Sequence, residues 1–399
     1  MTKLQNQFQH FALNGYMEIE MLIKRPIYNQ QLKCVAFEVL SHQHTKQDEQ
    51  LDTLLLELIT NSDTQLPLFI PFALKALLDK FETPIENPII LKLLAEDIES
   101  IYSLTELENS LFSIALIITT PQQLAWLNFA EYIGLTEELM SKNDLTKVVK
   151  FSRDNQRKVI AYGIDKALSF DKCKAMTMDY YCGDFLFKPL EDDKTDITAN
   201  KLNLLQLIQS IQHKDCNLKD FSDIIQNDPL LSFQLLKVAN LGVFSGYQAI
   251  ESIDQAINRL GIINLKNWIM ILSLKNISDK PKEILESGLI RAHMAEELAK
   301  KSTNISAQCA YTVGLLSILD CLLNKPMPEL INQITLAEEI KNALTNKTGP
   351  LGELLSLVVA YEEGHWEEVP HTSCNGLDLS KLYIDCLGVV STRAKAMLV

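Results

Sequence analysis

The 399-residue sequence predicts an α/β domain built on a parallel sheet, followed by an all-α domain. In the first half, short apolar runs alternate with helical patterns, which is typical of a parallel sheet covered on both faces. After Pro189 this alternation stops, and helices with clear start and stop signals follow one another. We place the domains at residues 17–190 and 201–395, with the polar, acidic segment Leu190–Lys201 as the linker.

Seven short apolar runs, rich in β-branched residues, predict the strands of the first domain. They are Met17–Ile23, Cys34–Leu40, Leu68–Phe72, Ile89–Leu94, Ser113–Ile118, Lys158–Ile164 and Tyr180–Phe187. Apolar residues spaced three and four positions apart predict helices between these strands. The helices are expected at Leu51–Leu58, Ala73–Phe81, Pro121–Phe129, Glu137–Ser152 and Lys166–Met176.

Capping signals divide the second half into short helices. Two capping boxes are predicted, one with Gln255 and one with Glu338 at its third helical position. We therefore expect a bundle of about eight to ten helices of ordinary length. The predicted N-terminal caps are Asp228, Ser252 and Thr335, and the predicted stops are Gly242, Gly261 and Gly349–Pro350.

The composition excludes several classes of protein. The net charge of −14 makes nucleic acid a poor candidate partner, because phosphate contacts require a basic surface. The eight cysteines form no C-x-x-C pair and mostly lie in apolar runs, so we expect reduced, buried thiols rather than disulfides or a metal site. The first residues contain no apolar core typical of a signal peptide, so we expect none, and no long apolar segment follows. We expect a soluble cytoplasmic protein without membrane insertion.

Two segments of the first half resemble EAL domains, the cyclic di-GMP phosphodiesterase barrels. Lys24–Leu40 resembles the first two strands of that family, and Glu38-Val39-Leu40 stands at the Glu-Ala-Leu signature. Lys158–Leu190 resembles the end of the family, with its strand, Gly, helix and Gly-aromatic-Lys-Pro order. The resemblance implies a TIM-barrel-like domain. Because such barrels usually take about 250 residues, we expect an abbreviated barrel.

The second half resembles the HDOD domain, a non-catalytic relative of HD phosphohydrolases. The runs Asp228–Gly242, Ala249–Trp268 and Gly314–Ile331 carry this resemblance. Together the two resemblances cover nearly the whole chain and indicate an EAL–HDOD signalling protein.

The first part of the EAL-like site departs from the family pattern. EAL hydrolysis uses water activated by two metal ions, which need several carboxylate ligands. The resemblance leaves Glu38 as a metal-ligand position but puts Pro71 where the family has an Asn. Lys92 stands where the family has a ligand Glu, and its charge would repel a metal ion.

The later positions depart further. Ile117 and Ile118 replace the Asp pair of the family, and Gly134 stands at the catalytic Lys. Tyr162 replaces a Glu, and Cys182 replaces a Gln. We therefore expect no metal ion, no cofactor and no catalytic residue in the barrel.

A vestigial groove remains, composed of Glu38, His42, Asp165 and Cys182. His42 stands at the family's phosphate-contacting Arg, and Asp165 keeps a carboxylate. Glu38 is either a relict metal ligand or, as we favour, a polar strand residue with a local hydrogen-bond partner.

The HD-like site is also altered in the second half. Ser317 and Ile318 stand where HD hydrolases carry their His-Asp pair, and Asp320 has no His beside it. His293 is expected to be a surface or satisfied core residue, and His365 to be exposed.

Three functions remain open. We favour a catalytically inactive regulator that acts through protein partners and is linked to cyclic di-GMP signalling in bacterial motility or attachment. The alternatives are a receptor that binds cyclic di-GMP weakly without cleaving it, and a residual phosphodiesterase. Either domain could support a homodimer.

Overall fold

The computed structural model describes residues 21–42, 49–61, 65–79, 85–98, 112–140, 145–189, 197–212, 222, 225, 229–240, 250–369 and 377–397. The chain divides into two compact units. The barrel unit comprises Gly15–Lys188 together with Asp378–Ile384, and the helical unit contains Pro189–Leu377 and the chain after Ile384. The predicted helical domain, 201–395, thus contains seven residues that cluster with the barrel unit.

The first unit is a closed barrel of eight strands, which confirms the TIM-barrel-like prediction. Its sheet is complete, and neighbouring strands in the sheet are neighbours in sequence, with β8 closing on β1. The strands are β1 (Met21–Asn29), β2 (Cys34–His42), β3 (Leu68–Pro71), β4 (Ile89–Leu94), β5 (Ser113–Ile118), β6 (Tyr132–Leu135), β7 (Lys158–Tyr162) and β8 (Tyr180–Cys182). We did not predict β6, because its four residues include a glycine and are too few to show periodicity.

Strand β1 corrects the prediction of a parallel sheet, because it runs antiparallel to both β2 and β8. The connection from β1 to β2 is too short for the crossover that parallel strands require. Asn29 stabilises this tight turn: its Oδ1 accepts hydrogen bonds from the backbone N–H groups of Gln31 and Lys33, both at 3.0 Å. Leu32 adopts a positive φ of 58° within the turn.

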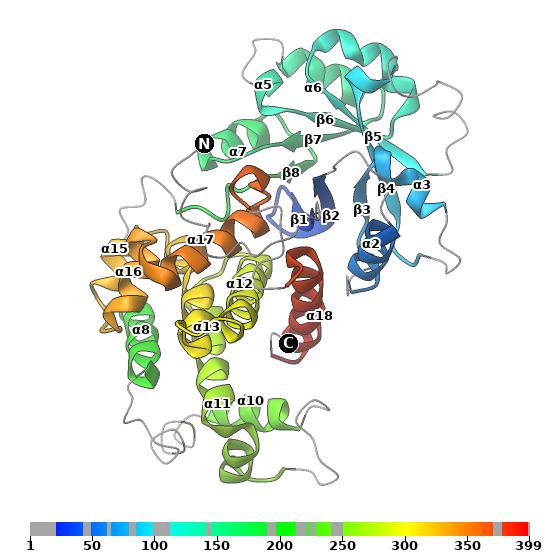
Figure 1. Cartoon of the computed structure of the whole chain (residues 1–399). Helices are drawn as coiled ribbons and strands as arrows, with labels where there is room; N and C mark the ends of the chain where they lie inside the picture. Colours follow the sequence, from blue (N-terminus) through cyan, green and yellow to red (C-terminus); the bar gives the residue numbers. More distant parts are fainter. Residues whose placement is uncertain are drawn as a thin grey trace. The chain divides into compact units, whose positions relative to one another are not determined.

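Two connections in the outer layer contain 3-10 turns where α-helices were predicted. The helix predicted at Ala73–Phe81 is a 3-10 turn, η2 (Phe72–Leu74), followed by one helical turn, α3 (Lys75–Leu78). The helix predicted at Pro121–Phe129 is the 3-10 helix η4 over the same residues. The other outer elements are α2 (Glu49–Asn61), η3 (Ala95–Asp97), α5 (Glu137–Met140), α6 (Leu145–Asp154) and α7 (Ala167–Ala175). Figure 1 shows α6 and α7 outside the strands.

The second unit is helical, as predicted (Figure 1). Its elements are α8 (Ala199–Gln212), α10 (Pro229–Ala239), α11 (Ile253–Ile277), α12 (Lys282–Lys300), α13 (Ala307–Leu316), α14 (Leu319–Leu323), α15 (Met327–Ile331), α16 (Glu338–Asn346), α17 (Gly349–Glu363), η5 (Trp366–Glu368) and α18 (Leu379–Met397). The first turns of α18 belong to the barrel unit.

The predicted helix signals have mixed outcomes. Ser252 caps α11, because its side chain accepts a hydrogen bond from the backbone N–H of Gln255. Gly261 interrupts the helix with a φ of 72°, which separates two straight segments. Thr335 is not a cap: α16 begins after Ala337, which forms no side-chain cap bond. The predicted ends Asp228 and Gly242 lie outside the described residues.

The described cysteines are free thiols: Cys34, Cys173, Cys182, Cys321 and Cys386 are buried, and Cys309 is half-buried. Cys216 and Cys374 lie outside the described residues. In the part of the chain that the structure describes, no helix is both long and apolar enough to cross a membrane.

Candidate functional site

Glu38 and Lys92 form an ion pair inside the barrel. Strand alternation places Glu38 on the same face of β2 as the core residue Ala36, and Lys92 on the same face of β4 as the core residue Ile90. Lys92 Nζ donates a hydrogen bond to Glu38 Oε1. The two residues are far apart in sequence, so closure of the barrel brings them together.

The Cys182 thiol forms a hydrogen bond with the other oxygen of the Glu38 carboxylate. Its Sγ donates to Glu38 Oε2 at 3.2 Å. The Glu38 side chain is 4% exposed and that of Lys92 is 17% exposed. A buried ion pair contributes little net stability, but removal of one partner usually costs about 3–5 kcal/mol because the other charge is left uncompensated. Glu38 is therefore held by two partners in a mostly dry environment.

Ile117 and Tyr162 fill the space above Gly134. A Cβ atom built on Gly134 would lie 2.3 Å from Ile117 Cδ1 and 2.7 Å from Tyr162 Cε2. Both side chains belong to the barrel core. A longer side chain at position 134 could enter only if these two side chains moved. We call Ile117 and Tyr162 the apolar plug. It covers Gly134, the position that the EAL resemblance gives to the catalytic lysine.

Tyr162 and Cys182 are kept neutral by their surroundings. Burial, and then the nearby Glu38 carboxylate, raise the pKa of the Tyr162 hydroxyl and of the Cys182 thiol well above their ordinary values. The Tyr162 hydroxyl forms no hydrogen bond to any described residue. Lys92 Nζ lies 5.8 Å from the centre of the Tyr162 ring. Neither group is poised as a base or nucleophile at neutral pH.

The donor groups in the barrel do not fit a two-metal centre. Divalent cations of the Mg²⁺ type need several oxygen ligands. Here the Glu38 carboxylate is paired with an ammonium and a thiol, and its neighbours Ile117 and Tyr162 offer no carboxylate. Among the described residues, no group of three or more His, Cys, Asp or Glu side chains is placed to hold a metal ion.

Of the predicted groove, the structure brings Cys182 into contact with Glu38. His42 ends β2 and is half-buried, and Asp165 is half-buried in the segment after β7. Of the two isoleucines, only Ile117 is in the barrel core cluster, whereas Ile118 alternates to the other face of β5. Pro71 pairs with Lys92 in the β3–β4 ladder.

The HD-like position in the helical unit is filled by packing. The Ser317 hydroxyl donates to the Gly314 carbonyl oxygen at 2.7 Å. Ile318 packs against α12 so closely that a Cβ atom on Gly288 would lie 2.6 Å from Ile318 Cδ1. Asp320 accepts a hydrogen bond from the backbone N–H of Cys321 at 2.8 Å, and burial raises the pKa of the Asp320 carboxyl.

The histidines of the helical unit have local partners. His293 is 8% exposed and its ring lies edge-to-face with Tyr311, with ring centres 5.3 Å apart. Its Nδ1 is 3.6 Å from a carboxylate oxygen of Glu296. His365 is exposed, and its Nδ1 lies 3.7 Å from a Glu363 oxygen. His293 is thus a satisfied core residue.

Sequence reasoning missed a buried ionic network centred on Arg291. Arg291 donates two hydrogen bonds to Glu362, at 3.0 and 2.7 Å, and one to Glu363 at 3.1 Å. The Ser287 hydroxyl donates to the other oxygen of Glu362 at 2.7 Å. This network joins α12 to α17. A basic residue within an otherwise small and apolar run, GLIRAHMA, was the signal for it.

Comparison with known families finds a match within the helical unit. Residues 201–349 match the HDOD domain family. Among curated proteins, the chain is 26% identical over 389 residues to the uncharacterized protein YuxH of Bacillus subtilis, which covers 90% of this chain and 94% of that protein. It is also 26% identical over 264 residues to the cyclic di-GMP phosphodiesterase CdgJ of Vibrio cholerae, covering 64% of this chain and 61% of CdgJ.

Similar solved structures contain EAL domains. One is the Bacillus subtilis YkuI protein in complex with cyclic di-GMP and calcium, with 13% identity and a TM-score of 0.34, covering 65% of this chain and 76% of that one. Another is the FimX EAL domain of Pseudomonas aeruginosa bound to cyclic di-GMP, with 12% identity and a TM-score of 0.33, covering 49% and 98%. Residues 201–349 thus match the HDOD domain family, as predicted for the second half of the chain, and the first unit is a closed eight-stranded barrel.

Proposed function

We propose that this protein is a regulator in cyclic di-GMP signalling, that its barrel does not hydrolyse the dinucleotide, and that it acts by binding other proteins. The observation that carries the proposal is the Glu38–Lys92 ion pair. It puts an ammonium group, instead of a metal ion, beside the carboxylate of the signature position.

The chemistry of phosphodiester hydrolysis supports an inactive barrel. Metal-assisted hydrolysis requires ligands that hold the ion and leave a position open for water. The Lys92 ammonium donates a hydrogen bond to the Glu38 carboxylate, so a protein side chain takes the place that a metal ion would need. Ile117 and Tyr162 close the space over Gly134, and the glycine itself offers no side chain at the position of the family's catalytic lysine.

The relatives support the link to cyclic di-GMP. CdgJ is a cyclic di-GMP phosphodiesterase, and this chain matches it over 61% of its length at 26% identity. Two chains that share this architecture can differ in activity if the ligands of one have been replaced. Both units keep a packed fold, although Ile117 in the barrel and Ser317 in the helices stand at enzyme-like positions; this supports a role through protein contacts.

The direct test of inactivity is incubation of the full chain with cyclic di-GMP and Mg²⁺ or Mn²⁺, with separation of the linear product. We expect no product above the protein-free blank. Product that forms with the wild type and disappears with Glu38→Gln would refute the proposal. Calorimetry with the same ligand distinguishes the receptor alternative: saturable heat without turnover would replace the inactive regulator with a non-hydrolysing receptor.

The role through protein contacts needs its own test. A tagged full chain is used to capture partners from its host, and a candidate is then bound to the chain as a purified protein. We expect at least one partner that binds saturably in the purified system. Failure of every candidate to bind would contradict this part of the proposal.

A further inference from the structure

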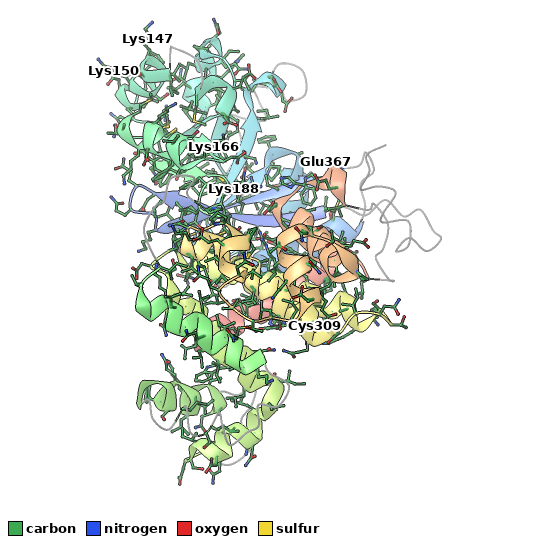
Figure 2. The ribbon with its side chains drawn as sticks, turned by 90° about the vertical axis from the view of Figure 1, so that its left-hand side faces the viewer. Lys147, Lys150, Lys166, Lys188, Cys309 and Glu367 are labelled. Carbon is green, nitrogen blue, oxygen red and sulfur yellow. The ribbon has the colours of Figure 1, made fainter. Side chains whose placement is uncertain are left out.

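The segment that contains α6, β7 and α7 is basic although the whole chain is acidic. Residues 145–176 contain eight Lys or Arg and three Asp side chains, a net charge of +5, whereas the whole chain carries −14. We define the basic face by the exposed residues Lys147, Lys150, Phe151, Leu168 and Lys172. Figure 2 shows Lys147 and Lys150 at the surface of the barrel unit.

The sequence of each helix directs these residues outward. In α6 the buried residues are Leu145, Val148, Val149 and Ser152. Their spacing places Lys147, Lys150 and Phe151 on the opposite side of the helix. In α7, burial of Phe170 and Cys173 leaves Leu168 and Lys172 on the outer side.

A hydrogen bond connects the ends of these neighbouring segments. Arg153, in the last turn of α6, donates to the hydroxyl of Thr177, which follows α7. In a barrel, helices that follow consecutive strands lie beside each other in the outer layer. The outward residues of α6 and α7 therefore contribute to one side of the unit.

This face combines exposed apolar side chains with lysines. Phe151 is 50% exposed and Leu168 is 65% exposed, which is high for large apolar residues. Lys150 and Lys172 form no salt bridge to any described residue. Exposed apolar groups flanked by such cations favour an acidic, partly aromatic ligand over a neutral one.

The helical unit carries a turn with this chemistry. Glu367 and Glu368, in η5, are exposed and form no salt bridge to any described residue (Glu367 is labelled in Figure 2). Trp366 precedes them, half-buried against Tyr361 with ring centres 5.8 Å apart. We call Trp366–Glu368 the acidic turn.

We propose that the acidic turn of one copy of this chain docks on the basic face of a second copy. The carboxylates of Glu367 and Glu368 would meet Lys150 and Lys172, and the contact would cover part of Phe151. Each chain carries both surfaces in equal number, so a second copy is a complementary partner that is always present. Two reciprocal contacts give a closed two-fold dimer, and single contacts give an open chain. This docking does not depend on whether the barrel hydrolyses cyclic di-GMP.

Sedimentation velocity of the full chain, across protein concentration and salt, tests the association. The contact joins exposed charges, and the Debye length falls from about 8 Å at 0.15 M to about 3 Å at 1 M salt. We therefore expect reversible association that weakens at least about tenfold at high salt. A monomer at every concentration, or association that salt does not weaken, would overturn the inference.

Charge reversal identifies the two surfaces. K150E/K172E alone and E367K/E368K alone should each weaken association by at least about tenfold, because like charges then face each other. An equimolar mixture of the two variants should restore association. The reversed turn of one variant is then complementary to the reversed face of the other. Matched controls are the exposed substitutions K33E and E251K, which should associate as the wild type does.

The mixing step keeps the test decisive even if a variant is less stable. All four substituted residues are exposed, so circular dichroism and thermal unfolding should match those of the wild type. Variants that are folded but associate like the wild type, or a mixture that stays monomeric, would refute the proposed pairing of surfaces.

Discussion

Removal of the Lys92 ammonium tests the role of the ion pair inside the barrel. Lys92→Met keeps most of the side-chain volume but leaves the Glu38 carboxylate, 4% exposed, with only the Cys182 thiol as a partner. Loss of one partner of a buried pair costs about 3–5 kcal/mol. Because the Lys92 side chain is 17% exposed, we expect the lower end of that range, about 3 kcal/mol of barrel stability.

A second substitution separates the charge from the packing. Glu38→Gln in the Lys92→Met background removes the uncompensated charge, so the double variant should recover most of the lost stability. Urea unfolding, followed by hydrogen exchange of peptides from β2 and β4, reports on the barrel apart from the helical unit. A Lys92→Met cost below about 1 kcal/mol, the range of surface pairs, would refute a buried ion pair.

Three further predictions concern packing, reactivity and pH. Gly134→Ala should destabilise the barrel by about 1–3 kcal/mol in thermal unfolding, because its Cβ would meet Ile117 at 2.3 Å; adding Ile117→Ala should reduce the cost. In native protein at mildly alkaline pH, iodoacetamide followed by peptide mass spectrometry should label half-buried Cys309 before Cys182, whose thiol pKa is raised by burial. Equal labelling would contradict the buried position of Cys182. Burial raises the pKa of Asp320 above its unfolded value, so the folded state favours the protonated acid and loses stability as pH rises through that pKa. Asp320→Asn should therefore stabilise the helical unit at neutral pH, with a gain that shrinks on acidification; a gain that is independent of pH would exclude this explanation.

The sequence predicted those features that local patterns specify. The strand at Ile89–Leu94 has the predicted bounds because a continuous apolar run encodes it. Ser252 and Gly261 act as predicted because capping and positive φ depend on a few neighbouring residues. The prediction for Thr335 was wrong because a capping pattern can also occur two residues before the real N-cap, Ala337.

Features that depend on closure of the barrel could not be predicted. The pairing of Glu38 with Lys92 joins strands 54 residues apart, and its Cys182 contact joins residues 144 apart. The sequence favoured a local partner for Glu38, but both partners come from other strands. The apolar plug above Gly134 is likewise formed by two different strands, β5 and β7. The sequence showed which metal-ligand positions were substituted. It did not show that Lys92 and Cys182 would become the partners of Glu38.

Manganese binding tests the central claim most directly, because the claim is that Lys92 takes the place of a metal ion beside Glu38. Titration of the full chain with Mn²⁺, followed by electron paramagnetic resonance of the free ion, measures occupancy without any need for turnover. We predict that wild type and Glu38→Gln bind Mn²⁺ equally weakly. Tight, stoichiometric binding by the wild type that is lost in Glu38→Gln would contradict the account.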